Sequence, residues 1–220
     1  MDSLELKFPN MVYEWRGVTR VSAAVVLFAG LSGSVIAQPS SISGFGNVLG
    51  FNVNSAGISG AAITGGTLTL MDSGAHERRT AFYAIKKDIT TFFVYQAGDG
   101  TNPPADGAAF IIQNDARGLG ALGDGGSALG YGGGPVATAI HPSVALEFNI
   151  FDHNKHGIQV VTNGSFGSYI DTAPVELASG HPILVRALYE GGTLDIILTD
   201  TASNGSSRIS SRSIFRPRLV

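Results

Sequence analysis

The chain has 220 residues, enough for one domain with a sizeable core. Hydrophobic residues make up 44% and charged residues 14% of it, a composition that excludes a largely disordered polypeptide. The formal net charge of −3 gives no electrostatic reason to expect a nucleic-acid partner, and the absence of cysteine excludes disulfides and thiolate metal sites.

The N-terminal part has the layout of a secretory leader. Arg16 and Arg20 precede an apolar run, Val21–Ala37, which ends in small residues before Gln38. A membrane anchor is the alternative, but the run is short of the roughly 20 apolar residues that a span needs. We therefore expect residues 1–37 to be a signal peptide with an upstream extension. The mature protein is then secreted or extracytoplasmic and does not span a membrane.

From Gly44 onward the sequence predicts strands and turns with almost no helical period. Its 30 glycines and nine prolines lie among short apolar or alternating runs, which is typical of tight turns between strands. Asn163-Gly164 predicts a turn, and Glu190-Gly191-Gly192 predicts a hairpin. The expected strands are Thr67–Leu70, Ala81–Ile85, Thr90–Gln96, Ala108–Gln113, Val144–Phe148, Gly157–Thr162, Ile183–Tyr189 and Thr193–Thr199.

Strands this frequent, without helices between them, predict an all-β antiparallel sandwich or barrel. The glycine-dense stretch Ala116–Pro135 is expected to be a long loop, and such loops in compact domains are usually functional. The segment Ser210–Val220 is basic and lacks strand alternation. We therefore expect one domain at 38–201 and an atypical basic tail at 202–220.

Three motifs follow one another in the middle of the chain. Ala105–Phe110 (ADGAAF) leads into an apolar strand, Gly125-Gly126 lies in the glycine loop, and Val144–Asn149 leads into Phe151–Ile158. In this order and spacing they resemble the legume-type (L-type) lectins, including their bacterial relatives. The resemblance covers most of the expected domain. It implies a concanavalin A-like jelly-roll sandwich that binds glycans or glycoconjugates through loops at one end.

The resemblance also implies roles for single residues. The aspartate of the ADG loop, here Asp106, accepts hydrogen bonds from two sugar hydroxyls, and its bond to Ala105 is usually cis. A glycine of the second loop donates a backbone N–H, and an asparagine of the metal loop completes the site. Asn154 supplies the residue type, although strict counting from the strand reaches His153. The implied carbohydrate-binding residues are Asp106, Gly107, Gly125, Gly126 and Asn154.

Both loops also have plainer explanations. An aspartate after Pro103-Pro104 is common in ordinary turns, and a glycine-rich segment is often only a flexible surface loop. The chemistry of the motif is nonetheless that of a sugar site, because a carboxylate accepts from paired hydroxyls and glycine lets a ligand approach the backbone.

The family holds a Ca²⁺ and a Mn²⁺ ion with an E-x-D strand end and the loop after it. Here the strand ends Glu147-Phe148-Asn149, so that an amide replaces one carboxylate, and the loop to the histidine is short. Fewer carboxylates generally weaken Ca²⁺ binding. A weakened metal site and a degenerate loop without metal both stay open. The implied ligands are Glu147, Asn149, the Phe151 carbonyl, Asp152 and His156.

Two other function classes compete with the lectin. A glycoside hydrolase on the same sandwich needs paired carboxylates on one face, whereas Glu147 and Asp152 have opposite parity on an extended strand. A structural or adhesion module with a non-functional sugar site is the other alternative. The resemblance further implies strands after Thr201 that this chain lacks, as in a truncated or frame-shifted product. We expect a non-enzymatic lectin, with a homodimer as one option.

Overall fold

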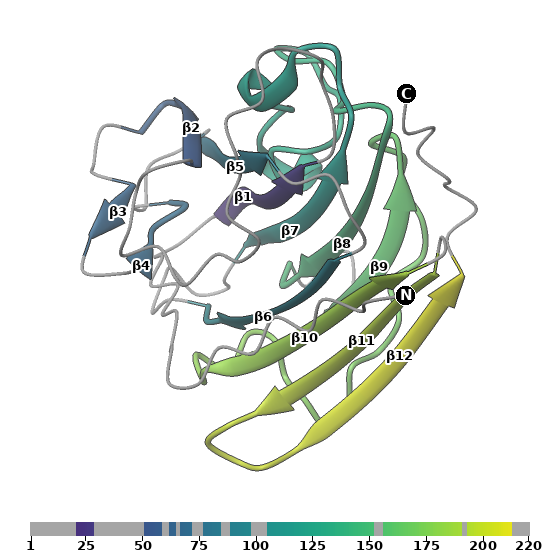
Figure 1. The fold of residues 1–220 in the computed structure, drawn as a ribbon. Helices are drawn as coiled ribbons and strands as arrows, with labels where there is room; N and C mark the ends of the chain where they lie inside the picture. The colour runs from purple at the N-terminus through teal and green to yellow at the C-terminus, as the bar shows by residue number, and fades with distance from the viewer. Residues whose placement is uncertain are drawn as a thin grey trace.

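The protein is an all-β sandwich of two facing sheets (Figure 1). The computed structural model describes residues 21–28, 51–58, 62–64, 67–71, 77–84, 89–97, 105–151, 156–190 and 193–212. The six-stranded sheet has the order β2-β5-β1-β7-β8-β9, the four-stranded sheet the order β12-β11-β10-β6, and β3 and β4 form a small third sheet. The strands are β1 (Val21–Phe28), β2 (Phe51–Ala56), β3 (Ile63–Thr64), β4 (Thr67–Leu68), β5 (Arg78–Ala84), β6 (Ile89–Tyr95), β7 (Asp106–Gln113), β8 (Ser143–Asn149), β9 (Gly157–Thr162), β10 (Ile183–Glu190), β11 (Thr193–Asp200) and β12 (Ser206–Arg212).

The eight strands that the sequence predicts between residues 67 and 199 are confirmed, with shifts of a few residues at their ends. The predicted hairpin is present, because Glu190 of β10 pairs with Thr193 of β11. The predicted turn after β9 is present too. Asn163 and Gly164 have φ angles of 57° and 69°, as a type I′ turn requires, and the Ser165 N–H donates to the Thr162 carbonyl over 3.0 Å.

Two strands lie where the sequence analysis places none. Val21–Phe28, assigned to the leader, forms β1 between β5 and β7. Ser206–Arg212, assigned to the atypical tail, forms β12 and pairs with β11 along its length. The sequence of this second strand, SSRISSR, is mostly serine and arginine and has no alternating apolar pattern that would predict a strand. Such polar residues suit an edge strand, where one side of the ladder faces solvent.

The main core lies between the two sheets. Its side chains come from alternate positions, as in β10, where Ile183, Val185, Ala187 and Tyr189 are buried and the residues between them are not. On the outer face of the four-stranded sheet, the residues of β10 that alternate with the core positions are exposed or half-buried. There Arg186 of β10 lies over the ring of its cross-strand partner in β6, which is consistent with an exposed cation–π contact.

A second core lies on the other face of the six-stranded sheet. Leu129, Tyr131 and Ile140 pack there against Phe82 of β5 and Ile111 of β7. The stretch predicted as a loop therefore covers the sheet, and it contains two short 3₁₀ helices, η1 (Gly118–Gly120) and η2 (Gly126–Ala128). Burial on both faces explains why β8 is buried at every position and β7 at all but its first.

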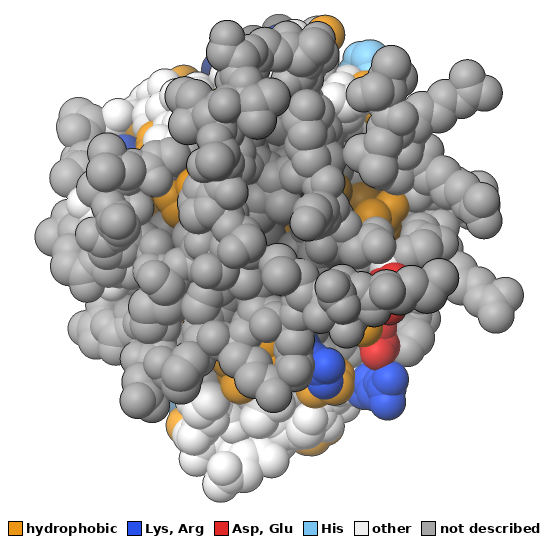
Figure 2. Space-filling view, viewed as in Figure 1, with side chains coloured by type: hydrophobic (Ala, Val, Ile, Leu, Met, Phe, Trp, Pro, Cys, Tyr) orange, Lys and Arg blue, Asp and Glu red, His pale blue; other side chains and the backbone are white. Residues whose placement is uncertain are grey.

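Figure 2 shows one face of the molecule. Positive and negative side chains lie side by side near β11 and β12 in this view. One ion pair of this kind joins Arg208 and Asp195 over 2.8 Å across the two strands.

Among the described residues, no helix is long and apolar enough to cross a membrane.

Candidate functional site

The ADG motif lies at the start of β7, at one end of the six-stranded sheet. Asp106 is partly exposed, and its bond to Ala105 is cis, as the resemblance implies. The Asp106 carbonyl accepts the N–H of Ile150 over 3.0 Å, which ties the motif to the end of β8. Gly107 has a φ of 146°, and a β-carbon on it would lie 1.9 Å from the Phe148 carbonyl oxygen. This position therefore requires glycine.

The glycine loop brings its second glycine to Asp106. A β-carbon placed on Gly126, which has a φ of 62°, would lie 3.9 Å from Oδ2 of Asp106. Gly125 is turned to another partner, since its N–H donates to Oδ1 of Asp124 over 2.8 Å. The two motifs that the sequence singles out thus meet in space. Of the two candidate glycines, Gly126 is the one that faces the carboxylate.

Asp124 organises the turn that carries Gly126. Its buried carboxylate accepts the N–H groups of Gly125 and Val136 and forms an ion pair with Arg78 of β5 over 3.2 Å. Burial alone would raise the pKa of Asp124, but the two backbone donors and Arg78 outweigh it, so that the pKa lies below its ordinary value. The carboxylate is therefore held in its charged form as a fixed support of the loop.

A further polar cluster is formed by Glu147 of β8, Gln159 of β9 and Tyr169, which follows β9 in the chain. The Glu147 carboxylate, 1% exposed, accepts hydrogen bonds from Nε2 of Gln159 and from the Tyr169 hydroxyl, the latter over 3.3 Å. Burial raises the pKa of Glu147 to about 7, although both hydrogen bonds act to lower it. Burial, the charge of Glu147 and that of Asp106 raise the pKa of Tyr169. Tyr169 thus lies within electrostatic reach of both acids.

The implied metal ligands are brought together only in part. Glu147 and Asn149 share a face of β8, alternating with Phe148 in the main core. Asn149 donates from Nδ2 to the Phe151 carbonyl over 3.2 Å. Nδ1 of His156 lies 2.9 Å from Oε1 of the exposed Glu176. The predicted residues Asp152, His153 and Asn154 lie outside the described residues.

The described donors do not by themselves fit a Ca²⁺ or Mn²⁺ site. Glu147 is the carboxylate among them, and its Oε2 already accepts two hydrogen bonds. Within the described part of the chain, no three His, Asp or Glu side chains group as a metal site would need. Ca²⁺ prefers several oxygen donors, more than one of them charged.

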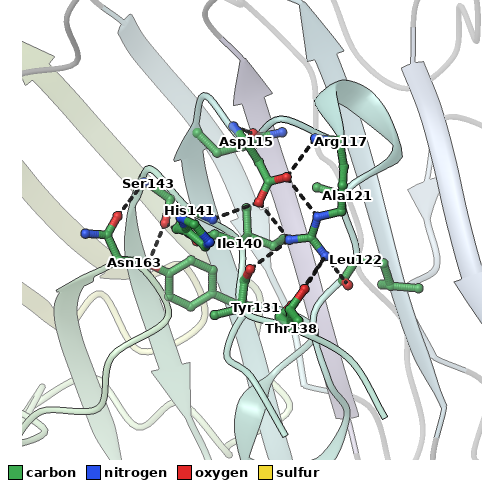
Figure 3. A network of polar contacts seen from close by, with 12 residues as sticks. Asp115, Arg117, Ala121, Leu122, Tyr131, Thr138, Ile140, His141, Ser143 and Asn163 are labelled. Atoms are coloured by element: carbon green, nitrogen blue, oxygen red, sulfur yellow. Dashed lines mark hydrogen bonds and ion pairs between the residues drawn. The ribbon is translucent and has the colours of Figure 1, made fainter.

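A network of hydrogen bonds that the sequence did not predict anchors the glycine loop near the end of β7 that lies away from Asp106 (Figure 3). Arg117 donates to both oxygens of Asp115, over 2.8 and 2.7 Å, and the His141 N–H donates to the same carboxylate over 2.8 Å. Burial would raise the pKa of Asp115, but these donors lower it to about 2. The remaining donors of Arg117 reach the backbone carbonyls of Leu122, Thr138 and Ala139.

A second set of contacts continues the network toward β8 and β9. The Tyr131 and Ser143 hydroxyls lie 2.9 Å apart, and the Ser143 N–H donates to Oδ1 of Asn163 over 3.0 Å. The Ser143 hydroxyl also donates to the Ile140 carbonyl over 2.6 Å. These bonds join the loop to the strands beneath it (Figure 3). Of these contacts, the Asp115–Arg117 pair is the one with a sequence signal, because an acidic and a basic residue lie two positions apart.

Neither protein-family models nor curated proteins provide a match for this sequence.

Proposed function

We propose that the protein binds a glycan at the end of the six-stranded sheet, where Asp106 and Gly126 meet. The observation that carries the proposal is this meeting of a partly exposed carboxylate with a loop position that has no side chain. A carboxylate accepts from paired sugar hydroxyls, and a bare backbone lets a ring approach closely. The finer fold assignment, a concanavalin A-like jelly roll of the L-type lectin family, belongs to the same proposal.

Binding rather than hydrolysis is supported by the burial of Glu147. Retaining hydrolysis needs two carboxylates about 5–5.5 Å apart that both reach the substrate. Glu147 is 1% exposed and already hydrogen-bonded to Gln159 and Tyr169, so its carboxylate is not presented to a substrate at the surface. We therefore propose a non-enzymatic lectin. Secretion, and the pairing of two copies through a sheet, remain part of this proposal.

The test is a glycan array followed by titration of the best glycan, with Asp106→Ala beside Asp195→Ala. Asp195 is an aspartate of the four-stranded sheet, paired with Arg208, and serves as the matched control. Hydrogen bonds to a charged group contribute about 1.5–3 kcal/mol each, so Asp106→Ala should weaken binding at least tenfold. Asp195→Ala should leave the Kd unchanged.

Both variants should keep the wild-type Tm. The loss of affinity in Asp106→Ala then does not come from a loss of folded protein. Binding to no glycan, or equal binding by Asp106→Ala and the wild type, would reject the proposal. Release of reducing ends from a polysaccharide would favour the hydrolase instead.

The same titration with EDTA, Ca²⁺ or Mn²⁺ decides the metal question. Because the described donors supply one carboxylate, we expect the Kd to change less than twofold on chelation. A loss of binding in EDTA that Ca²⁺ restores would place a metal site on residues 152–155 together with the described donors.

A further inference from the structure

β1 has an unusual place in the six-stranded sheet. It lies between β5 and β7 and runs parallel to both, pairing with residues 79–84 of β5 and 106–113 of β7. Every other pairing among the described strands is antiparallel. In Figure 1, β1 is the purple strand between β5 and β7. β5 and β7 are therefore separated by the width of one strand.

The gap that β1 fills would be costly to leave open. Tyr83 and Phe110 lie in the main core, and Phe82 and Ile111 lie in the core beneath the glycine loop. Both faces of the sheet are thus covered on either side of β1. Buried backbone N–H and C=O groups need partners, because water does not reach them. β5 and β7 use their outer sides for β2 and β8, so their inner sides need one strand between them.

The sequence of this segment suits such a place. Val21–Phe28 reads VSAAVVLF and contains no charge, proline or glycine. A parallel strand buried on both faces is expected to be a nearly continuous apolar run. The same run also satisfies the pattern of a leader. Composition alone therefore cannot separate the two roles.

The register links β1 to the candidate site. Val21 pairs with Asp106 and Ser22 with Gly107, so the first residues of β1 border the ADG motif on the side away from β8. We propose that the gap in the sheet between β5 and β7 is an acceptor site for one apolar β-strand, that Val21–Phe28 of the same chain occupies it, and that this strand holds the backbone at Asp106. A chain cut after Ala37 would lose this support once the strand leaves. The consequence of this support for ligand affinity rests on the proposed glycan binding.

The absence of cysteine makes a clean cross-linking test possible in the full chain. Ala24 pairs with Ala109 of β7, whereas Ala145 lies one strand further, in β8, opposite Ile111. Neighbouring strands lie about 4.7–4.9 Å apart, within the range of Cα separations that a disulfide spans, and strands two places apart lie beyond it. Oxidation should therefore form a disulfide within one chain in the double variant Ala24→Cys/Ala109→Cys. In the control Ala24→Cys/Ala145→Cys it should form at least tenfold more slowly.

Equal rates in the two double variants, or no disulfide in either, would overturn the proposal. A disulfide between two chains would show that a second copy supplies the strand, which overturns the assignment to the same chain. A protease site inserted after Ala37 gives an independent readout. After the cut, the fragment that contains β1 should stay bound in size-exclusion chromatography, and its removal in mild denaturant should lower the Tm. Release at once with no change in Tm would contradict the proposal.

Glycan titration of these samples separates the two proposals. The cross-linked protein should keep the wild-type Kd, and the protein stripped of its fragment should bind at least tenfold more weakly. A correct cross-link with no glycan binding by any sample supports the placement of β1 between β5 and β7 and rejects the proposed function. Equal glycan affinity before and after removal of the fragment rejects the role of β1 in holding Asp106.

Discussion

At Gly107 the backbone of β7 lies close against that of β8. A β-carbon there would lie 1.9 Å from the Phe148 carbonyl oxygen, and the φ of 146° disfavours other residues as well. Gly107→Ala must therefore move one strand away from the other. We expect a loss of free energy of unfolding on the order of 3 kcal/mol, measured by denaturant unfolding.

Gly120 offers the matched control for this substitution. It is exposed in η1, and a β-carbon on it would meet nothing within 4 Å. Gly120→Ala should change the free energy of unfolding by less than about 0.5 kcal/mol. If the two variants are equally stable, the close approach of β8 to Gly107 is not what requires glycine at this position.

Glu147 should give the protein a pH dependence near neutrality. Burial raises its folded pKa to about 7 from an ordinary 4.5, so the folded state binds this proton more tightly than the unfolded chain. The stabilisation is complete below pH 4.5 and is lost as the pH rises through 7. Relative to Glu147→Gln, the wild type should lose on the order of 2–3 kcal/mol of stability across this window.

Denaturant unfolding at several pH values in EDTA measures the difference, because groups common to both proteins cancel. Asp115, whose pKa is lowered to about 2, acts only at the acid end of the scale and does not overlap this window. Parallel stability profiles for the wild type and Glu147→Gln between pH 4.5 and 7 would contradict the assignment.

At the level of elements, the glycine loop is held by Arg117. This side chain donates to Asp115 and to three backbone carbonyls, and a lysine cannot reproduce that planar set of donors. Arg117→Lys should cost about 1–3 kcal/mol and speed hydrogen exchange of the amides between residues 122 and 139. Arg208→Lys, on an exposed single ion pair, should change neither.

The strands were predictable because their signals are local. Alternation and turn residues fix β10, β11 and the turn at Asn163-Gly164 without knowledge of the rest of the chain. The meeting of Asp106 with Gly126 followed only from the family resemblance. Tyr169 could not be found, since nothing near it in the sequence indicates that its hydroxyl reaches Glu147 over 3.3 Å.

The two strands that the sequence did not predict, β1 and β12, have sequence patterns of opposite kinds. β12 is a polar edge strand, paired with β11 but lacking an alternating apolar face in its sequence. β1 is a continuous apolar run, a pattern that a leader and a strand buried on both faces share. Both assignments depend on which neighbour the segment meets, and local patterning does not contain that information.

At the scale of the molecule, aromatic rings join the two sheets. Phe148 of β8 stacks on Tyr95 of β6 with centroids 5.1 Å apart, and it meets Phe93 edge to face at 6.2 Å. Phe148 is 1% exposed, whereas Phe166 is 62% exposed. Truncation of a buried phenylalanine typically costs about 3–5 kcal/mol, so Phe148→Ala should lose that much stability, and Phe166→Ala less than about 0.5 kcal/mol.

This contact also predicts how the sandwich unfolds. Phe148 belongs to the six-stranded sheet and both of its partners belong to the four-stranded sheet, so neither sheet keeps its core when the other opens. Unfolding followed by far-ultraviolet circular dichroism, which reports strands, should coincide with that followed in the near ultraviolet, which reports aromatic packing. Phe148→Ala should shift both midpoints together. Two separate transitions would mean that the four-stranded sheet is stable on its own, and the rings would then join two units that fold independently.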